Sequence, residues 1–241
     1  MAGRTLLNNV DHMDVRVITR HEPRFGDAVN QALVFPTEFE ALQREYPIFF
    51  RRDANGALQA VVLLGLDRDE NLYLGDGRWQ ARYVPAIHRR GPFSIALQAR
   101  PGQAPEPMIH IDLDHPRVSQ TEGEALFLPA GGNSPYLQEL SRTLGDIYEG
   151  LEAGKAMFAI FEEMSLIEPV SVGVRLDETV EYDVPGLHTI NAERLDQLAG
   201  AQLEALHRAG FLRLAYAVAA SLPNMSRLIE LKNRKRAARA A

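Results

Sequence analysis

Two potential metal ligands, His110 and Asp112, stand two residues apart in a segment that has the pattern of a β-strand. Alternate residues of a strand project from the same face, so both side chains could reach one ion. A facial iron site needs such a pair together with a distant histidine, which His188 could supply. Arg194 could then bind the carboxylate of a co-substrate. The pattern predicts, as an alternative, an iron-dependent oxygenase-like metalloenzyme, whereas a polar turn at a strand end explains the same residues without chemistry.

The segment from Trp79 to Phe93 concentrates aromatic and basic residues in one short stretch. Aromatic residues and arginine are enriched at the energetic centres of protein interfaces. Pro85 and Pro92 would stiffen the segment and lower the entropy lost on binding. The segment therefore predicts a binding surface for a peptide or protein, with the first two aromatics as apolar anchors and the arginines engaging an acidic group. A second interpretation, in which the aromatics pack into the core, is equally open. The predicted binding residues are Trp79, Tyr83, His88, Arg89, Arg90 and Phe93.

No further catalytic motif is present in the sequence. The chain has no cysteine, which excludes disulfides, thiolate zinc sites and cysteine nucleophiles. No serine lies in a G-x-S-x-G elbow, and neither the G-x-G-x-x-G nor the G-x-x-x-x-G-K-[ST] nucleotide-binding pattern occurs. The sequence therefore identifies no catalytic residue and favours a non-enzymatic protein without a cofactor, iron being the cofactor of the alternative.

The net charge of the chain indicates which partners are expected, and its hydropathy indicates in which compartment it lies. The net charge of −6 repels nucleic acid and anionic lipid. The basic residues between Lys232 and Arg239 fit a helix end whose dipole favours cations, so no nucleic-acid partner is expected. The apolar run from Phe211 to Leu222 is too short for a membrane span of about 20 residues, and the N-terminus lacks the apolar core of a signal peptide. We expect a soluble, cytoplasmic protein without a transmembrane segment.

The first part of the chain, residues 1–128, has the pattern of short strands between turns. Apolar and β-branched runs are bounded by Gly, Pro, Asn and Asp, as is typical of strands. The candidate strands are Leu33–Phe35, Tyr46–Phe50, Ala57–Leu66, Leu72–Leu74, Phe93–Leu97 and Met108–Leu113.

The second part, residues 129–241, changes to helical periodicity. Ser134 and Pro135 mark a helix start, and an apolar stripe from Leu137 to Phe161 predicts a helix of about 30 residues with a buried face. Alternating valines between Val170 and Val184 predict a β-hairpin. Together the two parts predict an α+β fold, one domain over residues 1–241 with a shared core, since no flexible linker separates them.

Five long stretches carry a resemblance to known proteins: Leu6–Val17, Asn30–Asp53, Tyr83–Phe93, Ile111–Ser119 and Leu206–Lys235. They resemble one bacterial family, SapC, which is named for a surface-layer-associated protein. The resemblance covers almost the whole chain and implies a link to cell-surface layers and to systems that include outer-membrane receptors. It implies no catalytic residue. We therefore expect a binding or accessory protein for a peptide or protein of a cell-surface or outer-membrane uptake system.

Overall fold

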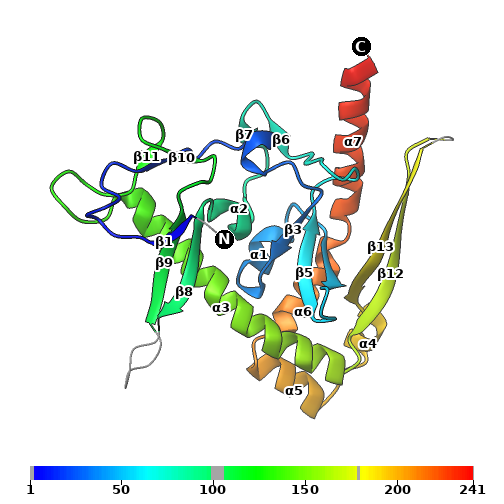
Figure 1. Ribbon diagram of the computed structural model, residues 1–241. Helices are drawn as coiled ribbons and strands as arrows, with labels where there is room; N and C mark the ends of the chain where they lie inside the picture. The colour runs from blue at the N-terminus through cyan, green and yellow to red at the C-terminus, as the bar shows by residue number, and fades with distance from the viewer. Residues whose placement is uncertain (1–2, 99–105, 178–179, 241) are drawn as a thin grey trace. The chain divides into compact units, whose positions relative to one another are not determined.

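The computed structural model describes residues 3–98, 106–177 and 180–240 (Figure 1). The chain divides into two compact units, and each unit is built from two separated segments of sequence. The first unit comprises residues 1–27 and 86–148, and the second comprises residues 28–85 and 149–241. The long helix α3, Pro135–Glu163, contributes its beginning to the first unit and its end to the second. The single domain over residues 1–241 with a shared core stays a prediction.

The first unit contains two three-stranded antiparallel sheets. In one sheet β9 lies between β1 and β8, and in the other β2 lies between β10 and β11. The strands are β1 (Arg4–Leu6), β2 (Arg16–Val17), β8 (Phe93–Gln98), β9 (Glu106–Asp112), β10 (Val118–Ser119) and β11 (Glu124–Ala125). The helical elements are the 3-10 turn η1 (Pro23–Phe25), α2 (Ala86–Arg89) and the beginning of α3.

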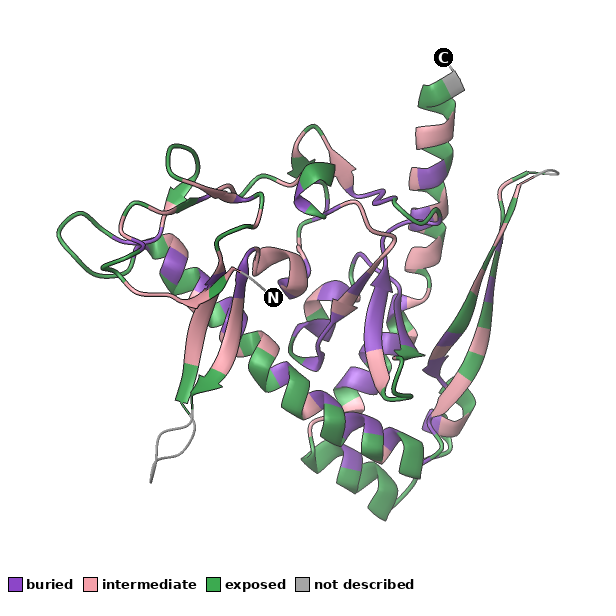
Figure 2. Ribbon diagram, in the orientation of Figure 1, coloured by how far each residue is buried: buried purple, intermediate pink, exposed green. Residues whose placement is uncertain are grey.

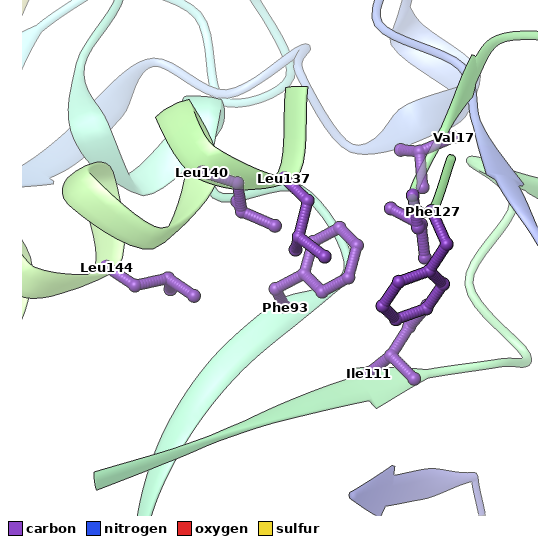
Figure 3. Close-up of a cluster of buried hydrophobic side chains, with 8 residues drawn as sticks. Val17, Phe93, Ile111, Phe127, Leu137, Leu140 and Leu144 are labelled. Carbon is purple, nitrogen blue, oxygen red and sulfur yellow. The ribbon is translucent and has the colours of Figure 1, made fainter. Parts of the chain in front are cut away.

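A cluster of buried apolar side chains forms the core of the first unit (Figure 3). Phe93 and Ile111 are cross-strand neighbours of β8 and β9, so their side chains leave the sheet on the same face. Three leucines of α3 at helical spacing pack against them, because residues three and four apart share one face of a helix. The cluster comprises Val17, Phe93, Ile111, Leu126, Phe127, Leu137, Leu140 and Leu144.

The second unit is built around a five-stranded antiparallel sheet with the order β12-β13-β4-β5-β3. Most of β5 is coloured as buried in Figure 2. Its last four residues are buried because β5 has a neighbour on each side and apolar residues on both faces. The strands are β3 (Gln31–Val34), β4 (Ile48–Arg52), β5 (Leu58–Leu63), β12 (Ile167–Arg175) and β13 (Glu181–Ile190), with a small separate pair β6 (Leu74–Gly75) and β7 (Arg78–Trp79). The helical elements are η2 (Pro36–Glu38), α1 (Phe39–Leu42), the end of α3, α4 (Ala192–Asp196), α5 (Ala201–Arg208), α6 (Leu212–Ser221) and α7 (Asn224–Ala240).

The predicted α+β fold is confirmed, with strands concentrated in the first half and helices in the second. The predicted hairpin is present as β12 and β13 and extends beyond residues 170–184 at both ends. The long helix starts at Pro135 as expected. One residue of its apolar stripe, Leu151, is not in the core, because 48% of it is exposed. Within the described residues no helix is long and apolar enough to cross a membrane.

Leu144 and Leu151 lie in different environments, so truncating their side chains to Ala should lower the stability of the protein by different amounts. Leu144 is 2% exposed and belongs to the core of the first unit. Leu144→Ala should lower the free energy of unfolding by about 2–5 kcal/mol, since it leaves a cavity. Leu151→Ala removes an exposed side chain from the same helix and should change the free energy of unfolding by about 0.5 kcal/mol or less. Urea unfolding followed by circular dichroism measures both, and equal losses would contradict the assignment of Leu151 to the surface.

Candidate functional site

A pocket of about 230 Å³ lies within the first unit, beside α2 and the beginning of α3. Its walls combine apolar side chains with an unusual number of groups that can carry a positive charge. The pocket is lined by Val17, Ile18, Thr19, His21, His88, Arg89, Gly91, Arg117, Tyr136, Glu139, Leu140 and Thr143.

A single buried carboxylate, Asp27, organises the charged side of this pocket. The Arg117 guanidinium donates from its Nη2 atom to Oδ2 of Asp27 at 2.5 Å. The Nδ1 atoms of His21 and His88 lie 3.4 and 3.3 Å from Oδ1 of the same carboxylate. The backbone N–H of Glu22 donates to Oδ2 at 2.9 Å. One carboxylate therefore fixes the positions of two imidazole rings and one guanidinium.

The surroundings of Asp27 keep it ionised. Its side chain is only 3% exposed, and burial alone would raise the pKa of the carboxyl group. Hydrogen bonds with His21 and His88 and the charge of Arg117 outweigh burial, so the pKa of Asp27 lies well below its ordinary value. Asp27 is thus an anion at any physiological pH and compensates the charge of Arg117.

Arg117 ties the opposite wall of the pocket to the same network. Its Nη1 atom donates to the backbone carbonyl oxygens of Ile18 at 2.9 Å and of Arg20 at 2.6 Å. Its guanidinium also lies over the ring of Phe25, 4.7 Å from the ring centre. The segment after β2 therefore takes its path from one buried arginine that lies nearly 100 residues away in sequence.

The lining of the pocket also includes an arginine, a carboxylate and a half-buried phenol. Arg89, at the end of α2, is 29% exposed, and its Nη1 atom lies 4.0 Å from Oε1 of Glu139 on α3. Glu139 lies closer to Arg142, at 3.0 Å, so its charge is shared between two cations. Burial raises the pKa of Tyr136 to about 12, so its hydroxyl group stays protonated and can donate a hydrogen bond. An acceptor-rich group such as a carboxylate matches this set of side chains.

The predicted binding segment from Trp79 to Phe93 is divided between the two units. His88 and Arg89 line the pocket of the first unit. Phe93 belongs to its buried core, and Arg90 donates to the backbone carbonyl of Phe93 at 2.9 Å. Burial, together with the charge of Arg4, lowers the pKa of Arg90. Arg90 is therefore tied to the framework of the unit and does not line the pocket.

Trp79 and Tyr83 belong to the second unit and form a buried chain of hydrogen bonds. The indole N–H of Trp79 donates to the hydroxyl of Tyr46 at 2.7 Å, and that hydroxyl donates to the carbonyl of Tyr83 at 2.6 Å. Trp79 and Tyr46 are both buried. The hydroxyl of Tyr83 donates in turn to Glu38 at 3.1 Å. Trp79 thus has the core environment that the sequence left open as the second interpretation.

The three residues of the predicted iron site do not belong to one unit. His110 and Asp112 lie on β9 of the first unit, whereas His188 lies on β13 of the second, opposite Phe50 of β4. Arg194 donates through Nε to the carbonyl of Met164 at 3.2 Å. Among residues 3–98, 106–177 and 180–240, no three histidine, aspartate or glutamate side chains are grouped so that they could hold a metal ion.

Sequence reasoning missed the central residues of the pocket. His21 and Asp27 lie in a segment without periodic hydrophobicity, and Arg117 is distant from both in sequence. One signal was available, because Arg117 falls within the stretch Ile111–Ser119 that carries part of the family resemblance.

Comparison with known proteins gives one match. The family model described as SapC matches residues 7–228 and so includes both units. No curated protein and no solved structure matches the chain significantly.

The depressed pKa of Asp27 predicts how the stability of the chain depends on pH. Asp27→Asn leaves the charge of Arg117 buried without its partner and should cost about 3–5 kcal/mol at pH 7. The stability due to Asp27 is present above the pKa of an unfolded aspartate, about 3.9, and is lost as pH falls through the lower folded value. The difference between wild type and variant, from urea unfolding, should therefore shrink below about pH 4. Asp14→Asn, at an exposed position, is the control; a loss of similar size there would contradict the role of Asp27.

Because no three potential ligands are grouped within the part of the chain that the structure describes, we expect the purified chain to carry no stoichiometric iron or zinc. Elemental analysis by mass spectrometry measures the metal content directly. About one iron per chain in the wild type, lost in His110→Ala, would contradict this expectation and favour the metalloenzyme.

Proposed function

Because the chain belongs to the SapC family, we propose that it is a non-enzymatic binding or accessory protein for a peptide or protein of a bacterial cell-surface or outer-membrane uptake system. The observation that carries the proposal is the pocket of the first unit, which holds His88 and Arg89 over the network of Asp27. The proposal keeps the cytoplasmic location expected from the sequence, with which the lack of cysteine is compatible.

The size of the pocket favours a protein partner. Pockets that enclose whole small molecules or cofactors usually have volumes of about 300–1,000 Å³. At about 230 Å³ this pocket is smaller, and it suits one inserted side chain of a larger partner. Interfaces commonly concentrate their affinity in such anchors, which fill a well-packed pocket while the surrounding contacts exclude water.

The charge of the pocket favours an acidic anchor. Two arginines and two histidines line it, against one glutamate, while the chain as a whole carries a net charge of −6. Asp27 beneath them is held by Arg117 and the histidines. Glu139 in the pocket lining is 60% exposed and stays paired with Arg142. An incoming aspartate or glutamate can therefore take the place of Glu139 beside Arg89 and form a charge-assisted hydrogen bond.

The pairing of the cations at the start of the basic tail supports a protein partner rather than nucleic acid. A cation that already compensates a buried carboxylate is not available to neutralise a phosphate without loss of stability. On α7 this holds for Lys232 and Lys235, which both pair with the buried Glu70. Arg236 and Arg234 also form ion pairs within the second unit, with the exposed carboxylates of Asp177 and Glu230.

Two variants with opposite effects test the proposal. Immobilised full-length chain captures partners from a lysate of the native host, and mass spectrometry identifies them. Arg89→Ala should remove the specific partner, whereas Glu139→Gln should increase its recovery because it removes the competing carboxylate. Arg24→Ala, at an exposed arginine outside the pocket, is the matched control and should behave as wild type.

A partner captured equally by wild type and Arg89→Ala would contradict binding at this pocket. A second readout uses the identified partner itself. Each acidic residue of the partner is replaced in turn by the corresponding amide. At one position this replacement should reproduce the loss of binding seen with Arg89→Ala and reduce the affinity by about tenfold or more.

A further inference from the structure

A second hollow, in the second unit, is separate from the pocket described above. It is a cleft of about 430 Å³ between the end of α3, the residues that follow β3 and the hairpin of β4 and β5. This volume falls within the range of about 300–1,000 Å³ that is usual for small-molecule sites. None of the residues that line it takes part in the Asp27 network.

The cleft has an apolar floor and one exposed apolar wall. Val34, Phe35 and Phe158 line the cleft and are themselves buried. Leu151 also lines it, although 48% of Leu151 is exposed. The exposure of this leucine, on the stripe that otherwise faces the core, is therefore explained by the cleft. A bound apolar group would remove the same surface from water.

Two glycines of α3 border the cleft, and only one of them is required by packing. A Cβ atom on Gly150 would come within 2.6 Å of Cβ of Phe35, so α3 can approach at this point only without a side chain. A Cβ atom on Gly154 would meet only the ring of Pro36, at an ordinary distance of 3.8 Å. The protein could therefore hold a side chain at Gly154, at a gain in helix propensity. The missing side chain at Gly154 instead leaves the cleft open.

Positive groups outnumber negative ones at the rim. Arg52 and Lys155 line the cleft together with one carboxylate, that of Glu162. Arg52 is held by the carbonyl of Gly56 at 2.9 Å and by Glu162 at 2.8 Å. Lys155 pairs with Glu152, which does not line the cleft, and its side chain is 74% exposed. Such an exposed pair contributes little, so the ammonium group can turn toward a bound anion.

We propose that this cleft binds a small amphipathic monoanion, with its apolar chain against Leu151 and Phe158 and its carboxylate beside Lys155. The shape and apolar floor select a flexible aliphatic or aromatic tail, and the excess positive charge selects the sign of the head group. The inference is independent of the proposed function, because the cleft and the pocket share no residue.

Decanoate, titrated below its micelle concentration into the full-length chain, tests the proposal by calorimetry. The wild type should bind it at one saturable site and bind decyltrimethylammonium, with the same tail and the opposite charge, at least about tenfold more weakly. Gly154→Leu should reduce decanoate affinity by about tenfold or more, because its side chain occupies the space of the tail. Gly145→Leu is the matched control on the same helix, since its Cβ would meet nothing within 4 Å and it does not line the cleft.

Two further variants keep the test decisive if Gly154→Leu folds poorly. Leu151→Asp, at an exposed position, should repel the anion and remove binding. Lys155→Ala should weaken binding by about two- to fivefold, whereas Arg208→Ala should not, although Arg208 is a comparably exposed cation paired on its own helix. The absence of decanoate binding, equal binding by Gly154→Leu and wild type when both are folded, or equal affinity for the two oppositely charged probes would overturn the proposal.

Discussion

The ion pair between Asp27 and Arg117 sets the architecture of the first unit's pocket. Both side chains are almost fully buried, and neither charge would be tolerable there without the other. Their contacts fix the backbone at Ile18 and Arg20 and the rings of His21 and His88. An apolar pair of the same volume could stabilise the unit equally well, but it would not orient hydrogen-bonding groups. The main effect of the ion pair is therefore to orient the side chains that line the pocket, whatever its net contribution to stability.

The second unit uses the same device for a different purpose. Lys232, buried on α7, donates to Asp67 at 2.5 Å and to Glu70 at 2.9 Å. Burial would raise the pKa of Glu70, but hydrogen bonds from Lys232 and Lys235 lower it to about 2. These contacts attach α7 to the loop after β5. Each unit thus joins distant parts of the chain through a buried charge that has several partners.

The sequence predicted well those features that depend on local periodicity. The hairpin of β12 and β13 and the α3 stripe, apart from Leu151, follow from the spacing of apolar residues, and the start of α3 follows from Ser134 and Pro135. The division into two units was not predictable in this way, because both units are made of segments far apart in sequence. The same reason hid the pocket, since Asp27 and Arg117 have no local pattern in common. His88 and Arg89 were predicted as binding residues from the composition of their segment. That they line a pocket of the first unit while Trp79 belongs to the second unit follows only from the tertiary structure.

The interleaving of the two units has a consequence for synthesis on the ribosome. The first unit has all its strands, its apolar cluster and its charge network once Tyr148 has been added. Lys232, which the second unit needs, comes about 80 residues later, or roughly 4–17 s at the usual rates of translation. At the start of that interval the apolar strands β3, β4 and β5 have been synthesised, whereas the hairpin of β12 and β13 and then α6 and α7 are added only in the course of it. β3, β4 and β5 can already pair with one another, but the edge of β4 has no partner until β13 follows. Unpaired strand edges and exposed apolar surface favour aggregation, so the yield of folded chain should depend on chaperone capacity more than its size suggests.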